Sequence, residues 1–242
     1  MTGRIDVHSH LLPGLDDGCQ TVEESITCAQ ALVEAGYTHC ICTPHIWPNL
    51  PGNTVERITH LTLQLQRALD LAGVALHLIP GGEINLRPEY HLATSPKMVP
   101  TFAMAGKHAL IDLWAHTLPD HFEAGVRWLQ AQGLTVILAH PERMRAVQDE
   151  PQLADYFAEL GLLLQGNLQC FSDPVGSFTR TTVERFMRED RYFLLGSDMH
   201  GPGTIPSRLR GLQNAIRLAG AEKIRQLTID NPRQLLPEVP TS

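Results

Sequence analysis

Short apolar runs alternate with segments of helical periodicity along the whole chain. The first run alternates polar and apolar positions, whereas most later runs are almost continuously apolar. Both patterns are typical of short strands that enter a hydrophobic core, and about seven such strands are predicted. The predicted strands cover residues 4–8, 40–43, 74–79, 108–113, 134–139, 162–164 and 192–195.

Helical periodicity fills the intervals between these strands. Thr21 and Glu24 form a capping box that opens a helix ending at Gly36. Further helices are predicted over residues 55–71, 120–132, 152–160 and 181–189, with two or three more between 206 and 236. Strands that alternate with helices in this way form parallel sheets with right-handed crossovers. Since no Gly-rich fingerprint follows the first strand and no linker divides the chain, we expect one barrel-like α/β domain over residues 1–242.

Composition and charge exclude several classes of protein. The chain has 242 residues and a formal net charge of −7, and no basic stripe marks it as a nucleic-acid-binding protein. Five irregularly spaced cysteines do not form a disulfide framework. No signal-peptide pattern is present, and no apolar run reaches the roughly 18–20 residues of a membrane span. We therefore expect a cytoplasmic protein without membrane insertion; the sequence leaves its oligomeric state open.

Histidines and carboxylates stand at or just past the ends of nearly all the predicted strands. In chain order they are His8, His10, His45, Glu83, Asp112, His140, Asp198 and His200. In a closed parallel barrel the carboxyl ends of the strands form one rim, where active sites lie. Singly, His45 could be a loop residue and His140 a strand cap, but random residues would not give this set. Asp112, within an apolar strand, must be paired or metal-bound because burying a lone carboxylate is prohibitive.

This set of donors indicates metal-dependent hydrolysis. Imidazoles with carboxylates suit Zn, Mn or Fe better than Ca or Mg, and so many ligands predict two or three divalent ions. Paired ions lower the pKa of a bridging water and neutralise a leaving oxygen, which suits phosphoester hydrolysis. Arg143 and Arg208 follow two of the strand ends and could hold a phosphate. No Ser nucleophile elbow or Cys-His pair offers an alternative chemistry.

These motifs together resemble the PHP (polymerase and histidinol phosphatase) superfamily, whose motifs begin with a His-x-His strand and end with Asp-x-His. Residues 6–18, which read DVHSHLLPGLDDG, resemble the opening of its bacterial protein-tyrosine phosphatase branch. The same branch is indicated by Thr43-Pro44-His45, Gly82-Glu83-Ile84 and residues 138–143 and 196–200. The resemblance spans nearly the whole chain.

The resemblance implies a distorted TIM-like (β/α)7 barrel that holds three metal ions, usually manganese. It implies as metal ligands His8, His10, Asp17, His45, Glu83, His140, Asp198 and His200, with Arg143 and Arg208 as phosphate binders. It also implies dephosphorylation of tyrosines on the C-terminal tail of a bacterial tyrosine kinase that governs capsule or exopolysaccharide synthesis. In the expected mechanism Glu83 bridges two ions, and Asp198 or His200 handles the proton.

Three positions depart from the family pattern. Asp112 stands where the fourth strand usually carries Glu, and the loop after His45 reads IWPNLPG instead of a His- and Gly-containing sequence. The long spacing from His200 to Arg208 leaves Arg210 as an alternative phosphate binder. Because loops at this rim choose the substrate, small phosphate monoesters such as histidinol phosphate remain an alternative. A catalytically silent metal-binding subunit is a third reading.

Overall fold

The strands form a closed ring in which every pairing is parallel. The computed structural model describes residues 3–88, 95–113 and 116–236. One sheet has the order β1-β2-β4, and the other has the order β3-β5-β6-β7-β8-β9. The strands are β1 (Arg4–Ser9), β2 (Tyr37–Cys42), β3 (His45–Ile46), β4 (His77–Pro80), β5 (Glu83–Asn85), β6 (His108–Asp112), β7 (Thr135–Ala139), β8 (Leu163–Asn167) and β9 (Leu194–Gly196).

Two short chain connections and one strand–strand seam join these sheets into a barrel. Only residues 43–44 separate β2 from β3, and only residues 81–82 separate β4 from β5. The seam between β1 and β9 closes through a parallel bridge from Ser9 to Met199, where the His10 amide also donates to the Met199 carbonyl at 2.9 Å. If β2 with β3, and β4 with β5, are each counted as one interrupted strand, seven parallel strands form the barrel. The predicted fold is therefore confirmed.

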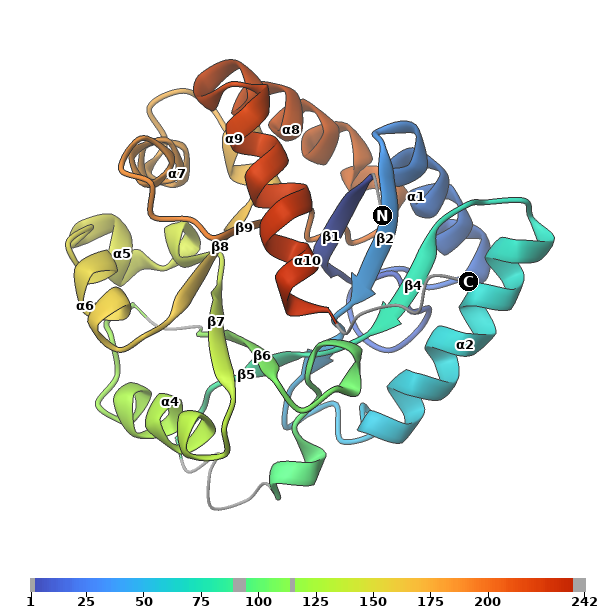
Figure 1. Cartoon of the computed structure of the whole chain (residues 1–242), viewed down its shortest axis with the longest axis horizontal. Helices are drawn as coiled ribbons and strands as arrows, with labels where there is room; N and C mark the ends of the chain where they lie inside the picture. The colour runs from blue at the N-terminus through green and yellow to red at the C-terminus, as the bar shows by residue number, and fades with distance from the viewer. Residues whose placement is uncertain (1–2, 89–94, 114–115, 237–242) are drawn as a thin grey trace.

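Helices form an outer ring around the strands (Figure 1). They are α1 (Val22–Glu34), α2 (Val55–Leu71), α4 (His121–Ala131), α5 (Arg145–Asp149), α6 (Leu153–Glu159), α7 (Phe178–Arg188), α8 (Ile205–Ala219), α9 (Ala221–Arg225) and α10 (Asn231–Leu235). Shorter 3₁₀ turns are η1 (Pro96–Met98), η2 (Phe102–Met104), η3 (Pro141–Arg143), η4 (Leu168–Ser172) and η5 (Pro202–Thr204), and η6 (Gln226–Asp230) is a π-helix. No helix among the described residues is long and apolar enough to cross a membrane.

Local sequence signals explain several boundaries. The Thr21 hydroxyl accepts from the Glu24 amide at 3.3 Å, while the Glu24 carboxylate reaches back to the Gln20 amide at 2.7 Å, so the predicted capping box forms. The strand predicted over 74–79 begins only at β4. Residues 74–76 form a tight turn instead, in which the Leu76 amide donates to the Val74 carbonyl at 2.9 Å.

The barrel interior is apolar and is closed at the amino ends of the strands. Ile5, Val7 and Ile137 belong to one buried cluster that also contains Leu235 from α10. The Asn231 side chain donates to the Phe193 carbonyl at 2.9 Å, just before β9 begins. Figure 1 shows α9 and α10 lying across this end of the barrel. The opposite end, where the strands point, is left for polar groups.

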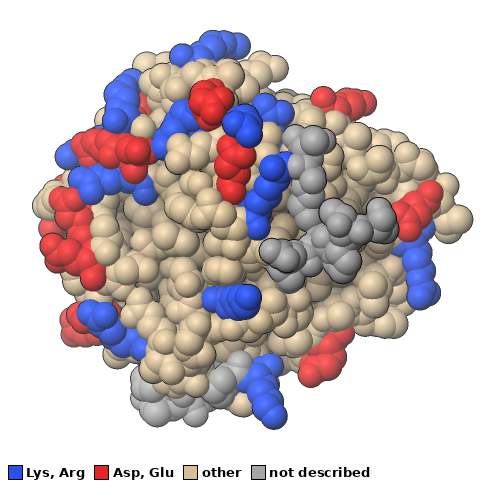
Figure 2. All heavy atoms as spheres, viewed as in Figure 1, with Lys and Arg blue, Asp and Glu red and all other residues tan. Residues whose placement is uncertain are grey.

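Charges of both signs are mixed on the face that carries α9 and α10 (Figure 2). On α9, Arg225 pairs with Glu222 at 3.2 Å and with Asp230 at 3.1 Å. Exposed pairs of this kind contribute little to stability. They give this end of the molecule a surface of short, local ion pairs.

Candidate metal centre

The carboxyl ends of the strands bring all nine predicted ligand residues together. They fall into four overlapping groups, and within each group the donor atoms lie within 4.8 Å of one another. The groups are His10, Asp17, His45 and His200; His8, His10 and Asp198; His8, Glu83 and His140; and His45, Glu83 and Asp112. Because several residues belong to two groups, the cluster has the form of adjoining sites.

Glu83, the first residue of β5, lies at the centre of the cluster and is fully buried. Its Oε1 lies 2.9 Å from His140 Nε2, and its Oε2 lies 2.8 Å from His45 Nδ1 and 3.4 Å from His8 Nε2. Burial alone would raise the pKa of Glu83, but the surrounding imidazoles, led by His8, hold it well below its usual range. The carboxylate is therefore ionised among several histidine nitrogens.

Two neighbouring atoms at the centre of the cluster are placed to bind a cation and not to hydrogen-bond to each other. Glu83 Oε2 and His45 Nδ1 are buried, and neither makes a hydrogen bond with the described residues, although 2.8 Å separates them. Buried polar atoms are normally satisfied, since leaving them unpaired costs about 1–3 kcal/mol each. A divalent ion with nitrogen and oxygen ligands satisfies both atoms at once.

Asp198 joins the cluster of candidate ligands to the cationic side chain of Arg143. Its Oδ1 lies 3.3 Å from His10 Nε2 and 3.4 Å from His8 Nε2. Its Oδ2 accepts hydrogen bonds from Asn167 at 2.7 Å and from the Arg143 guanidinium at 2.9 Å. Asp198 and His140 both have left-handed backbone conformations, with φ of 53° and 33°. Such strain costs of order 1–3 kcal/mol per residue and is found mostly at functional sites.

Outer hydrogen bonds aim two histidines at the cluster. Gln165 Oε1 lies 2.8 Å from His8 Nδ1, and Asp16 Oδ2 lies 2.7 Å from His10 Nδ1. Each oxygen is placed to accept a hydrogen bond from Nδ1–H, and in that tautomer Nε2 carries the lone pair that binds a metal. The pKa of Asp16 is lowered by His10 and by amide hydrogen bonds, which outweigh the effect of its burial. A Cβ on Gly18 would lie 2.3 Å from the His10 carbonyl, so only glycine lets this loop pack against the end of β1.

The cluster has one exposed edge and one buried edge. Asp17 Oδ1 lies 3.3 Å from His45 Nε2 and 3.5 Å from His200 Nε2, and the Asp17 side chain is 67% exposed. At the buried edge, Asp112 accepts from the Asn85 side chain at 3.1 Å and has no exposed surface. The cluster is therefore open to solvent on the side of Asp17 and His200.

Both predicted phosphate-binding arginines converge on Asp198. Arg143 lies in η3, and its side chain is 36% exposed beside the Asp198 carboxylate. Arg208 lies in α8, and its Nε and Nη2 donate to the Asp198 carbonyl at 3.3 and 2.8 Å. Arg210, the alternative, is exposed elsewhere on the same helix. The geometry therefore favours Arg208 over Arg210.

Several outer residues of the site escaped prediction from the sequence. Asp16 was not separated from Asp17, although only Asp16 reaches His10 Nδ1. Asp6 is buried and accepts hydrogen bonds from the Ser197 amide and hydroxyl, and burial raises its pKa to about 6. Glu142 is buried and accepts from the Tyr192 hydroxyl at 2.9 Å and from the Asn167 amide at 2.6 Å. The sequence signal for such residues is a carboxylate within an apolar segment, as at Asp112.

A closed parallel barrel with this rim of histidines and carboxylates defines a hydrolase-type metal centre. The chain belongs to the CpsB/CapC family of capsular polysaccharide synthesis, whose sequence model matches residues 4–237. The family indicated by the motifs is therefore confirmed. The chain is 28% identical to the tyrosine-protein phosphatase YwqE of Bacillus subtilis over 200 residues, which cover 83% of this chain and 78% of YwqE.

Three further comparisons are consistent with this result. The tyrosine-protein phosphatase CpsB of Streptococcus pneumoniae is 25% identical over 238 residues, which cover 96% of this chain and 98% of CpsB. One crystal structure comes from work on YwqE and CpsB, described as unique metal-dependent tyrosine phosphatases. It superposes on this chain with a TM-score of 0.87 at 27% identity, and the match covers 96% of this chain and 94% of the crystallised chain. A β-aspartyl dipeptidase of Fervidobacterium islandicum shares only the fold, with a TM-score of 0.58 at 12% identity.

Proposed function

We propose that this protein is a metal-dependent protein-tyrosine phosphatase that acts in capsular or exopolysaccharide synthesis. Relatives that match most of its length are tyrosine-protein phosphatases, and the family is one of capsular polysaccharide synthesis. The observation that carries the proposal is the placement of two arginines beside Asp198, one of the clustered ligand residues. The substrate is the phosphotyrosine-containing C-terminal tail of a bacterial tyrosine kinase.

The nine clustered residues are the ligands in this proposal, and they hold two or three divalent ions. Manganese is the first choice, with iron or zinc as alternatives, because imidazole and carboxylate donors suit all three. When bound, ions in such a cluster lower the pKa of a water molecule and withdraw charge from a phosphoryl group. Glu83 links the groups of donors, since it contacts His8, His45 and His140.

The chain itself supplies phosphate binding and orientation. Arg143 is half-exposed at the mouth of the site, where its guanidinium can donate to phosphoryl oxygens in a fixed planar geometry. Arg208 is held by the Asp198 carbonyl and adds a second positive charge at the same point. Both side chains favour the dianionic phosphate of an aryl ester.

Asp198 and His200 act mainly as positioned ligands in this mechanism. Asp198 Oδ2 already accepts two hydrogen bonds, and His200 Nδ1 donates to the Asp198 carbonyl at 2.9 Å. Burial, together with the neighbouring His10, lowers the pKa of His200 to about 4, which keeps this imidazole neutral near pH 7. The proton for the leaving tyrosyl oxygen then comes from the solvent-exposed edge at Asp17.

A substrate comparison tests the proposal. Manganese-loaded protein is assayed with a phosphotyrosine peptide, with histidinol phosphate and with p-nitrophenyl phosphate. We expect kcat/KM to be highest for the peptide. A higher value for histidinol phosphate would move the assignment to small phosphate monoesters. No turnover of any of the three, with ions bound by mass spectrometry, would contradict the enzyme assignment and favour the silent subunit.

A further inference from the structure

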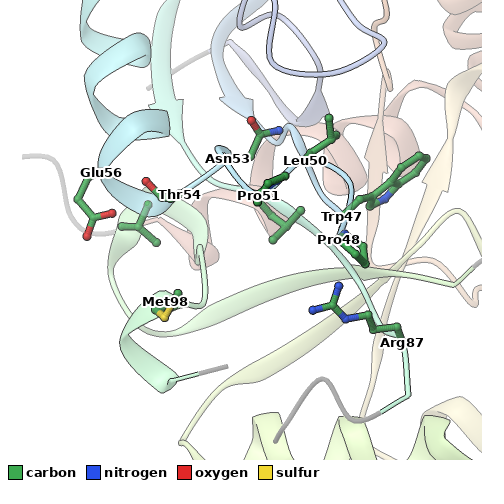
Figure 3. A pocket seen from close by; sticks show the side chains of 11 residues that line it. Trp47, Pro48, Leu50, Pro51, Asn53, Thr54, Glu56, Arg87 and Met98 are labelled. Atoms are coloured by element: carbon green, nitrogen blue, oxygen red, sulfur yellow. The ribbon is translucent and has the colours of Figure 1, made fainter. Parts of the chain in front are cut away.

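A groove of about 440 Å³ opens beside the metal centre, on the side of the loop that follows His45. Figure 3 shows Trp47, Pro48 and Arg87 towards one end of this groove and Glu56 and Met98 towards the other. Volumes of this size are typical of sites that enclose ligands much larger than a phosphate group. The groove therefore has room for side chains next to a phosphorylated residue.

One wall of the groove is fixed by hydrogen bonds. The Asn53 side chain donates to the carbonyls of Leu15 and His45, each at 2.9 Å, and is buried. Within the loop, the Leu50 amide donates to the Trp47 carbonyl at 2.9 Å and the Asn53 amide to the Leu50 carbonyl at 3.0 Å. These contacts hold the loop against the metal centre, so the wall is preformed and little ordering is needed on binding.

The groove is continuous with the metal centre through one aromatic contact. The Trp47 ring stacks on the imidazole of His45, with centroids 4.1 Å apart and an angle of 25° between the planes. His45 Nδ1 in turn lies 2.8 Å from Glu83 Oε2. A phosphotyrosine bound at the centre therefore has this groove directly beside it.

Charge differs along the groove. Arg87 follows β5 and is half-buried at the end nearest Trp47, and it forms no ion pair or hydrogen bond through its guanidinium with the described residues. Glu56, the single acidic side chain among the described lining residues, lies at the far end beside Met98. An acidic side chain is therefore favoured near Arg87, and an apolar one against the tryptophan and proline wall.

We propose that this groove binds the residues flanking the phosphotyrosine of a peptide substrate, with an acidic side chain at Arg87 and an apolar one on Trp47, Pro48 and Pro51. The inference rests on the proposed phosphatase function and names the sequence context that it selects. The loop that makes the wall, residues 46–52, is also the loop that departs from the family pattern. The groove thus gives this chain its own peptide preference.

The test uses four substrates and one charge reversal. Manganese-loaded wild type and Arg87→Glu are assayed with a phosphotyrosine peptide flanked by glutamate and leucine, with the same peptide carrying lysine for glutamate, and with p-nitrophenyl phosphate. We expect wild type to prefer the glutamate peptide by about fivefold in kcat/KM and Arg87→Glu to reverse this preference. Replacing the flanking leucine by glycine lowers kcat/KM for wild type by about fivefold. The matched control is Arg67→Glu on the exposed face of α2, which leaves the preference unchanged.

The outcomes separate the groove from the phosphatase function. If wild type hydrolyses all substrates without preferring the glutamate peptide, and Arg87→Glu shows the same lack of preference, the proposed role of the groove is overturned and the phosphatase function stands. If no substrate is hydrolysed, the proposed function fails, and binding of the labelled peptides is followed by fluorescence anisotropy. A preference that depends on Arg87 in that measurement still supports the groove, and equal binding of both peptides overturns it.

Discussion

The two ends of this barrel are built from the same strands but hold opposite kinds of side chain. At the amino ends, Leu235 from α10 closes an apolar interior that contains Ile5 and Val7. At the carboxyl ends, Glu83 and Asp198 are at most 1% exposed, yet they carry charge. Apolar burial stabilises one end, whereas the other contains buried ions that cost free energy unless they are paired or metal-bound.

This difference shows where stability and function lie in the molecule. The carboxyl end also contains two candidate ligand residues with left-handed backbone conformations, His140 and Asp198. Strained backbone and clustered charge persist only where the surrounding structure holds them in place. Substitutions at the carboxyl end should therefore change activity first, and substitutions at the amino end should change the free energy of unfolding first.

The largest effect is expected for Glu83→Gln at the carboxyl end. This change keeps the size of the side chain but removes the charge that contacts four histidines, so we expect kcat/KM to fall by about 10³-fold or more. The matched control is Glu222→Gln, whose side chain is 85% exposed on α9. Steady-state kinetics check the prediction, and a loss of less than tenfold would remove Glu83 from the centre of the mechanism.

At the amino end, Leu235→Ala should lower the free energy of unfolding by about 2–4 kcal/mol, because it leaves a cavity under the barrel. We expect kcat/KM to change less than twofold while the protein stays folded. Urea unfolding gives the free energy, and Leu71→Ala, at a residue that is 91% exposed, provides the control. A large loss of activity in Leu235→Ala would show that the two ends are coupled.

Arg143→Lys tests phosphate binding at the carboxyl end. Lysine keeps the charge but loses the planar pair of donors, and we expect kcat/KM to fall by about 100-fold. Arg210→Lys on α8 serves as the comparison and should change kcat/KM less than twofold, since Arg210 is exposed. Equal effects of the two substitutions would reopen the choice of phosphate-binding arginines.

A small pH effect is expected at the amino end from His108, the first residue of β6. Partial burial lowers the pKa of His108 below the usual histidine value of about 6.5. A depressed histidine pKa means that the folded state binds fewer protons, so stability is lost as the pH falls below 6.5. In urea unfolding, His108→Gln should lose less stability than wild type between pH 7 and pH 5, by under about 1 kcal/mol. Identical curves would contradict this, and exposed His60→Gln is the control.

The fold could be predicted from the sequence because its signals are local. The bounds of α2 follow from periodicity and from the cap at Thr54, whose hydroxyl accepts from the Arg57 amide. The capping box at Thr21 acts within one turn of helix. The start of β4 was missed since residues 74–76 are apolar but form a turn, and hydrophobicity alone does not distinguish these cases.

The candidate ligand residues could be predicted for a similar reason, but the side chains that hydrogen-bond to them could not. His8 lies near the end of β1, Glu83 follows the break after β4 and Asp198 follows β9, and a parallel barrel brings the carboxyl ends of its strands together. Gln165 lies in β8, 157 residues from His8, so no spacing in the sequence assigns that pair. Asp16 lies only six residues from His10, but two adjacent aspartates, Asp16 and Asp17, offer the same carboxylate at this point of the loop. The groove beside Trp47 likewise depends on how its loop folds over Arg87, which follows β5, and Met98 in η1.

The most direct test of the central claim is to strip the protein of metal and return manganese during hydrolysis of a phosphotyrosine peptide. The account predicts that the stripped protein is inactive, that manganese restores turnover by at least about 100-fold, and that Glu83→Gln is not restored. Full turnover without metal would contradict it. So would the absence of turnover with any divalent metal when mass spectrometry shows that ions are bound.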